Sequence, residues 1–139
     1  MINGHVSHWW EHIGLPDPRP TLTGHHTADV AIVGAGFTGL WTAYYLAKAQ
    51  PGLKIMVVES RHVGYGASGR NGGWLTNTVT GGRERYVKSH GRSAAEAFQE
   101  AMNRTVAEVI AVCEAEGIEA DIQQGGEFEV ACTPAQEIR

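Results

Sequence analysis

A glycine-rich junction between an apolar run and a helix-forming run constrains the fold more than any other part of the chain. Residues 28–34 read ADVAIVG and residues 35–39 continue as AGFTG, so the junction matches the pattern G-x-G-x-x-G. Glycine weakens both strands and helices, so three glycines here indicate that the backbone turns sharply or that another group approaches it closely.

The segments on either side of the junction predict a strand, a helix and a second strand. Residues 28–34 and 53–60 are continuous apolar runs, the pattern of strands buried on both faces of a parallel sheet. Between them, residues 38–50 carry apolar or aromatic side chains at helical spacing, namely Leu40, Ala43, Tyr44 and Ala47, and Pro51 then ends the helix. The three segments predict a right-handed βαβ unit of the Rossmann-like, FAD- or NAD(P)-binding kind in an α/β fold.

Within such a unit, each motif residue has a physical role. Gly34 would make the tight turn, Gly36 would let a pyrophosphate touch the backbone, and Gly39 would let helix and strand pack closely. The pyrophosphate would lie against the positive end of the helix dipole. Glu59, at the end of the second strand, can accept hydrogen bonds from ribose hydroxyls, and its charge argues against the 2′-phosphate of NADP. The motif predicts an adenine dinucleotide and leaves FAD and NAD both open.

A second glycine-rich loop, residues 59–77, follows directly on Glu59. It leaves backbone N–H groups accessible and adds side-chain donors, and it suits a second pass along the dinucleotide toward the redox ring. An NAD dehydrogenase would usually enter another crossover helix at this point. The residues concerned are Gly64, Gly66, Gly69, Gly72 and Gly73, with the donors Ser68, Arg70 and Asn71.

Two stretches together resemble a known family. DVAIVGAGFTGLWTAYYLA and VVESRHVGYGASGRNGG resemble the FAD-dependent D-amino-acid oxidase superfamily, in particular its γ-glutamylputrescine oxidase-like amine oxidases. The signature of that branch, G-x-G-A-S-G-R-N-G-G, fits residues 64–73 at every fixed position. The resemblance is most specific over residues 30–73 and extends more loosely to residue 131. Many members carry Gln after the paired glycines, where this chain has Trp74.

The resemblance implies an FAD enzyme that oxidises an amine or amino acid to an imine by hydride transfer to the flavin. Dioxygen or another acceptor would then reoxidise the flavin, as in an oxidase. The family has no universal catalytic base, so no catalytic residue is assigned. The implied cofactor contacts are Gly34, Ala35, Gly36, Phe37, Thr38, Gly39, Glu59, Ser60, Arg61, Gly66, Ala67, Ser68, Gly69, Arg70, Asn71, Gly72 and Gly73.

The expected organisation has three parts: a leader (1–27), the first segment of an FAD-binding domain (28–117) and the start of a substrate domain (118–139). Three prolines within residues 16–20 predict an extended connector in the leader. Because the chain stops where Pro134 favours a new helix, we expect it to be the N-terminal portion of a longer protein.

A long helix is expected to begin at Ser93, with Glu96 completing a capping box, and to end at Gly117. Residues 118–124 and 127–133 predict a hairpin around the Gly125–Gly126 turn. The apolar stripe of the long helix comprises Ala95, Phe98, Met102, Val106, Val109, Ile110 and Cys113.

Composition limits the kinds of partner that the chain can bind. A net charge of −4 over 139 residues argues against nucleic acid, and no apolar run is long enough to span a bilayer. The two cysteines form no disulfide framework, which together with the lack of a secretory start predicts a cytoplasmic protein. The early histidines (His5, His8 and His12) lack acidic or cysteine partners, so we favour a solvated leader over a metal site.

Trp9 and Trp10 are expected to dock onto the domain or onto a missing part, and a contact of His62 with adenine is a weaker interpretation. Two rival functions stay open: an NAD-dependent dehydrogenase, and a truncated, non-catalytic chain that binds only a nucleotide or a partner.

Overall fold

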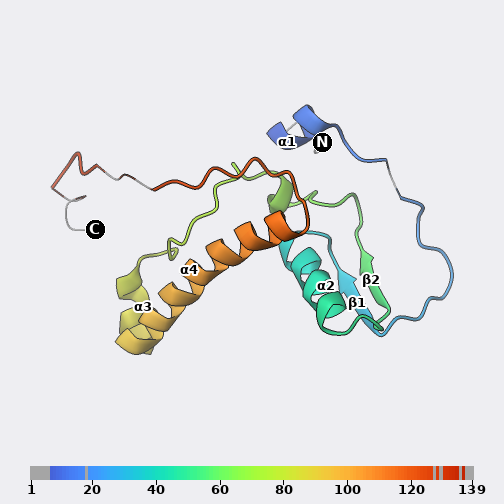
Figure 1. The fold of residues 1–139 in the computed structure, drawn as a ribbon, viewed down its shortest axis with the longest axis horizontal. Helices are drawn as coiled ribbons and strands as arrows, with labels where there is room; N and C mark the ends of the chain where they lie inside the picture. Colours follow the sequence, from blue (N-terminus) through green and yellow to red (C-terminus); the bar gives the residue numbers. More distant parts are fainter. Residues whose placement is uncertain (1–6, 18, 127, 129, 135, 137–139) are drawn as a thin grey trace. The chain divides into compact units, whose positions relative to one another are not determined.

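The chain divides into two compact units, residues 1–74 and 75–139. The computed structural model describes residues 7–17, 19–126, 128, 130–134 and 136, and Figure 1 shows their path. In chain order the elements of the first unit are α1 (His8–Ile13), β1 (Val30–Val33), α2 (Phe37–Ala49), β2 (Ile55–Val58) and the 3-10 turn η2 (Ala67–Gly69). The second unit contains α3 (Arg83–His90) and α4 (Arg92–Ala115).

The first unit is built on the predicted βαβ arrangement. β1 and β2 pair in parallel, with Val30 opposite Ile55 and Val33 opposite Val58, and α2 connects them (Figure 1). Asp29 fixes the start of the pairing, because its carboxylate accepts the Lys54 N–H at 2.8 Å and its own N–H donates to the Lys54 carbonyl at 3.0 Å. The expectation of two parallel strands joined by a helix is therefore confirmed.

The strands are less buried than the sequence predicts. Val33 is 87% exposed, and β1 alternates between half-buried and exposed positions. Among the described residues the sheet has only these two strands, and α2 packs on it from one side. Burial on both faces needs a second covering layer, so that prediction is wrong for the chain as described.

The third glycine of the motif lies where α2 crosses β1. A Cβ added to Gly39 would be 2.1 Å from the Gly34 carbonyl oxygen and 3.3 Å from Cγ2 of Ile32. Only a residue without a side chain permits this approach, because the Gly34 carbonyl group is backbone and belongs to the turn itself. The junction between strand and helix is therefore fixed by backbone contact.

The leader forms a short helix followed by an irregular segment. The Ser7 hydroxyl accepts the Trp10 N–H at 3.4 Å at the start of α1, and Gly14, with φ +79°, ends the helix. Residues 14–17 and 19–27 form neither helix nor strand, as the prolines predict.

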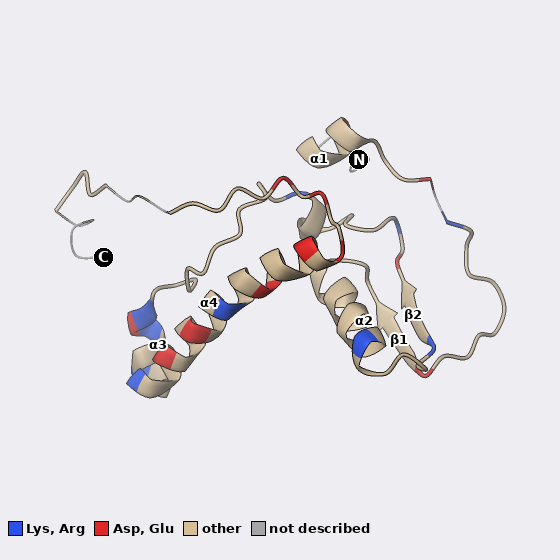
Figure 2. Ribbon diagram, in the orientation of Figure 1, with Lys and Arg blue, Asp and Glu red and all other residues tan. Residues whose placement is uncertain are grey.

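In the second unit, α3 and α4 form a helical pair that includes an element the sequence analysis missed. Tyr86 packs against Phe98 with ring centroids 5.2 Å apart, and Arg83 pairs with Glu96 at 3.0 Å. Basic and acidic residues are interspersed along these helices (Figure 2). The Glu96 carboxylate is thus engaged by α3, and α4 begins at Arg92 after Gly91 without a side-chain cap, so the predicted capping box at Ser93 is wrong.

The end of α4 follows the prediction. Gly117 adopts φ +65°, the Ile118 N–H donates to the Cys113 carbonyl at 2.8 Å, and the Gly117 N–H donates to the Glu114 carbonyl at 3.3 Å. This is the Schellman pattern, which satisfies the last carbonyls of a helix. The C-cap predicted at Gly117 is confirmed.

The predicted hairpin is not formed. Among the described residues, 118–126, 128 and 130–134 contain no strand, while residues 127 and 129 lie outside the described part. Phe128 is 90% exposed and Val130 is 62% exposed. A two-stranded hairpin is marginal unless one face packs on another element, and these apolar side chains are left uncovered. Most of the helix expected after Pro134 also lies outside the described residues.

The crossing of α2 and β1 gives a direct stability test. Gly39→Ala should lower the free energy of unfolding by about 3 kcal/mol, because the methyl group overlaps a backbone carbonyl that cannot move away without breaking the turn. Chemical denaturation measures the change. Gly52→Ala is the matched control, since a Cβ there meets no atom within 4 Å, and equal effects at both positions would contradict the close-packing interpretation.

Candidate functional site

The site begins at the turn between β1 and α2. Gly34 adopts φ +100°, in the region that favours glycine, and its N–H donates to the Val58 carbonyl at 2.7 Å. A Cβ added at Gly34 meets no atom within 4 Å, so the backbone is open on that side. α2 starts three residues later, and its first-turn N–H groups lack intrahelical acceptors. The turn therefore presents open backbone next to the positive end of a helix dipole.

Glu59 closes this turn from the end of β2. One carboxylate oxygen, Oε2, accepts the Ala35 N–H at 3.0 Å, and the other, Oε1, accepts the Arg61 N–H at 3.1 Å and the Ser60 hydroxyl at 3.2 Å. The Ala35 and Arg61 N–H groups hold the pKa of Glu59 below its ordinary value. Glu59 is therefore ionised at neutral pH, and its charge is held beside the turn.

The second glycine-rich loop packs against the first turn through two hydrogen bonds. The Gly64 N–H donates to the Ala35 carbonyl at 2.9 Å, and the Phe37 N–H donates to the Ser68 hydroxyl at 2.9 Å. Ser68 thus satisfies an N–H of the first turn of α2 from a position 31 residues away. Sequence spacing gave no signal for this long-range cap.

Arg70 and Asn71, predicted as donors toward a cofactor, donate side-chain hydrogen bonds to carbonyl groups of the loop itself. Asn71 Nδ2 donates to the Ser68 carbonyl at 2.9 Å, and its Oδ1 accepts the Gly73 N–H at 2.8 Å. Arg70 Nε donates to the Tyr65 carbonyl at 3.0 Å, and its guanidinium lies over the Tyr65 ring at 5.0 Å. These contacts shape the loop, and a cofactor contact by either residue stays a prediction.

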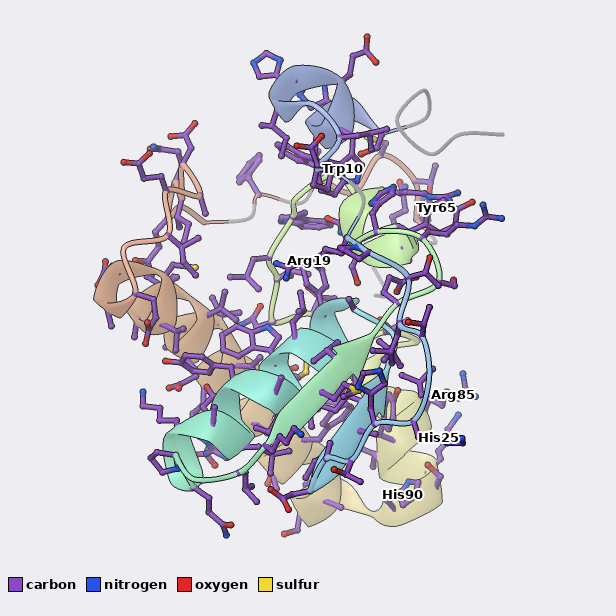
Figure 3. All side chains as sticks on the ribbon, turned by 90° about the vertical axis from the view of Figure 1, so that its right-hand side faces the viewer. Trp10, Arg19, His25, Tyr65, Arg85 and His90 are labelled. Carbon is purple, nitrogen blue, oxygen red and sulfur yellow. The ribbon has the colours of Figure 1, made fainter. Side chains whose placement is uncertain are left out.

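The leader helix packs on the same loop. Trp9 Nε1 donates to the Asn71 carbonyl at 2.8 Å, the Ser7 hydroxyl donates to the Gly69 carbonyl, and Trp10 contacts the His62 ring edge-on at 5.1 Å. Figure 3 shows Trp10 between α1 and the loop that carries Tyr65. The expectation that the two tryptophans dock onto the domain is confirmed.

His62 lies between two aromatic rings. Its ring contacts Trp10 at 5.1 Å and Tyr65 at 5.4 Å, and its Nε2 is buried. Its Nδ1 lies 3.0 Å from the Val63 carbonyl oxygen. The interpretation that His62 contacts adenine stays a prediction, and in this arrangement Nε2 is not available for it.

The structure brings one subset of the predicted site residues together and leaves others apart. Hydrogen bonds join Ala35 to Glu59 and Phe37 to Ser68, and the Ser60 hydroxyl and the Arg61 N–H also bind Glu59. The Arg61 guanidinium turns to the Tyr65 ring instead, at 5.8 Å. In the described ranges no group of three His, Cys, Asp or Glu side chains could hold a metal ion, and no described helix is both long and apolar enough to cross a bilayer.

The geometry therefore combines an open glycine turn, a helix N-terminus and a fixed carboxylate at the end of the next strand. Residues 29–139 match a protein family described as DAO, FAD dependent oxidoreductase. The chain belongs to this family. The resemblance noted in the sequence is thereby confirmed, as is FAD as the cofactor of the family.

Named relatives share shorter stretches. Gamma-glutamylputrescine oxidoreductase of Escherichia coli (strain K12) is 44% identical over 78 residues, which are 56% of this chain and 18% of that protein. The beta subunit of sarcosine oxidase of Rhizobium meliloti (strain 1021) is 48% identical over 56 residues, 40% of this chain and 12% of that protein. Thiamine thiazole synthase of Aspergillus oryzae (strain ATCC 42149 / RIB 40) is 54% identical over 54 residues, 39% of this chain and 15% of that protein.

These matches cover less than a fifth of the relatives' own length. The relatives carry names for different chemistries, so the stretch they share with this chain does not by itself identify a substrate. No solved structure matches the chain.

The hydrogen bonds of Glu59 predict a pH dependence. Because its pKa is lowered in the folded chain, Glu59 contributes stability that is present above its ordinary pKa of 4.5 and is lost as the pH falls through the lowered value. Glu59→Gln should therefore flatten the acid limb of a plot of unfolding free energy against pH. Glu84 is exposed on α3, and Glu84→Gln should leave that limb unchanged. An acid limb in Glu59→Gln as steep as in the wild type would contradict this role.

Proposed function

We propose that this chain forms the first part of the FAD-binding domain of an amine oxidoreductase. The enzyme oxidises an amine or amino acid to an imine by hydride transfer to the flavin, with dioxygen as the acceptor that completes an oxidase cycle. Residues 28–117 belong to the FAD domain, residues 118–139 begin the substrate domain, and residues 1–27 are a leader. The observation that carries the proposal is the open Gly34 turn at the N-terminus of α2, set beside ionised Glu59.

The pyrophosphate end of FAD fits this turn. Gly34 leaves open space beside the backbone, and an added Cβ at Gly36 would lie 3.0 Å from Ser68 Oγ, so this position also favours a residue without a side chain. The helix dipole of α2 stabilises negative charge at the same place. Glu59, held by the Ala35 and Arg61 N–H groups, would accept hydrogen bonds from the ribose hydroxyls.

The flavin end fits the second loop. Gly66 and Gly72 both have open backbone, because a Cβ at either position meets no atom within 4 Å. When bound, FAD supplies the acceptor for the two electrons and the hydrogen taken from the substrate carbon. The contribution of the chain is to hold this loop in one shape. Glycine at residues 66 and 72 keeps the open face of the loop free of side chains.

Amines and amino acids are the substrate class that the relatives favour. The names of two of them, gamma-glutamylputrescine oxidoreductase and sarcosine oxidase, refer to nitrogen compounds of this kind. Trp74, which follows the paired glycines, is 71% exposed at the end of the first unit. The proposed substrate is accordingly given as a class, amines and amino acids.

The proposal is tested on the full-length protein. We expect it to purify with the visible absorption of oxidised flavin, and to lose that absorption under anaerobic addition of at least one of γ-glutamylputrescine, putrescine, sarcosine and a D-amino acid. Release of peroxide on admission of air supports the oxidase assignment. A colourless protein that takes up no added FAD but binds NADH would contradict the proposal and favour a nicotinamide-dependent dehydrogenase.

Gly72→Ala tests the flavin end of the site. Since a methyl group at residue 72 meets no protein atom, the variant should unfold at the wild-type temperature while its FAD dissociation constant rises by about tenfold. Flavin fluorescence during titration of the apoprotein measures the constant. The control, Gly52→Ala, has equally open surroundings but lies in the turn after α2. Wild-type FAD affinity in Gly72→Ala would exclude a cofactor contact at this glycine.

A further inference from the structure

The glycines of the second loop fall into two groups according to what surrounds them. A Cβ at Gly66 or Gly72 would meet nothing within 4 Å. A Cβ at Gly73 would lie 2.8 Å from Cζ2 of Trp9. At Gly69 it would lie 2.9 Å from Nε1 of Trp10 and 2.2 Å from the Gly64 carbonyl oxygen. The loop therefore has an open face and a face that is covered by the leader.

The covered face is also held by hydrogen bonds from the leader. Trp9 donates its indole N–H to the Asn71 carbonyl at 2.8 Å, and Ser7 donates its hydroxyl to the Gly69 carbonyl. Trp10 reaches the beginning of the loop, where its Cζ2 would lie 3.5 Å from a Cβ at Gly64. Contacts from Ser7, Trp9 and Trp10 are thus spread along residues 64–73.

The loop has particular need of such support. Half of residues 64–73 are glycines, so the unrestrained loop has high backbone entropy. Gly64 and Ser68 tie the first part of the loop to the turn after β1, while the bonds made by Asn71 and Arg70 are internal and fix local turns only. The leader contacts restrain the loop against a separate element, which reduces the ordering cost when a ligand binds the open face.

We propose that Trp9 and Trp10 are positioning residues for the cofactor, and that the leader helix forms the outer wall of the loop that contacts the flavin. This inference rests on the proposed function. It also adds tryptophan packing to the reasons for glycine at residues 69 and 73, where the Gly64 carbonyl oxygen and a φ of +77° already favour glycine. The sequence interpretation assigned both positions to cofactor approach. Trp9 is the main anchor at residues 71–73, and Trp10 at residues 64–69.

A double-mutant cycle between Trp9 and Gly73 tests the proposal on the full-length flavoprotein. Trp9→Ala and Gly73→Ala should each raise the FAD dissociation constant by about tenfold. In the double variant the clash with the Trp9 ring is absent and only the strain of alanine at φ +77° remains, so the combined increase should be well below the product of the two single increases. Trp9→Phe keeps one aromatic ring but loses the N–H donated to Asn71 and part of the packing surface, and it should show a smaller increase, about fivefold.

Ile13→Ala is the matched control, because Ile13 lies on the same helix and is 72% exposed. It should bind FAD like the wild type. Unfolding temperatures of the apoproteins are measured in parallel. Wild-type FAD affinity in Trp9→Ala and Trp9→Phe, even with lowered unfolding temperatures, would overturn the positioning role, as would single effects that simply multiply. Failure of the wild type itself to bind FAD would instead overturn the proposed function.

Discussion

The first unit depends on the two hydrogen bonds of the Ala35 peptide groups. The Ala35 N–H is bound by the carboxylate of Glu59, and the Ala35 carbonyl accepts the N–H of Gly64. Ala35 is only 2% exposed, so these polar groups need partners within the protein. One residue of the first turn is thereby tied to the end of β2 and to the start of the second loop.

This connection explains why the two glycine-rich segments act as one surface. The turn that follows β1 cannot shift without moving Glu59, and the second loop cannot shift without moving the Ser68 hydroxyl that binds the Phe37 N–H. The open backbone at Gly34 and Gly72 is then a property of a fixed arrangement. Preorganised backbone of this kind binds an anionic ligand with little loss of conformational entropy.

Local patterns in the sequence predicted those elements that local physics determines. The βαβ unit follows from apolar runs and the helix-breaking Pro51, and the end of α4 follows from Gly117. The helix α3 was missed because its sequence, RERYVKSH, is mostly polar, and it is delimited by Gly82 and Gly91, both at positive φ. The cap at Ser68 could not be predicted, since it joins residues with no sequence periodicity between them.

Two of the incorrect predictions concern contacts with elements that are not among the described ones, whereas the capping box at Ser93 failed because Glu96 pairs with Arg83 of α3. Both the double-sided burial of β1 and the hairpin near Gly125 presuppose a second layer, and the exposed side chains of Val33 and Phe128 show that none covers them here. The leader is the opposite case. Its tryptophans find their partners within the first unit, so their docking could be anticipated from composition, although their target in residues 64–73 could not.

The most direct measurement is a crystal structure of the full-length protein with FAD bound. We expect the pyrophosphate beside Gly34 and the first turn of α2, the ribose facing Glu59, and the isoalloxazine along the open face of residues 64–73, with Trp9 still on the opposite face. A flavin ring far from Gly72, or one that occupies the position of the Trp9 ring, would contradict the assignment of this loop to the cofactor.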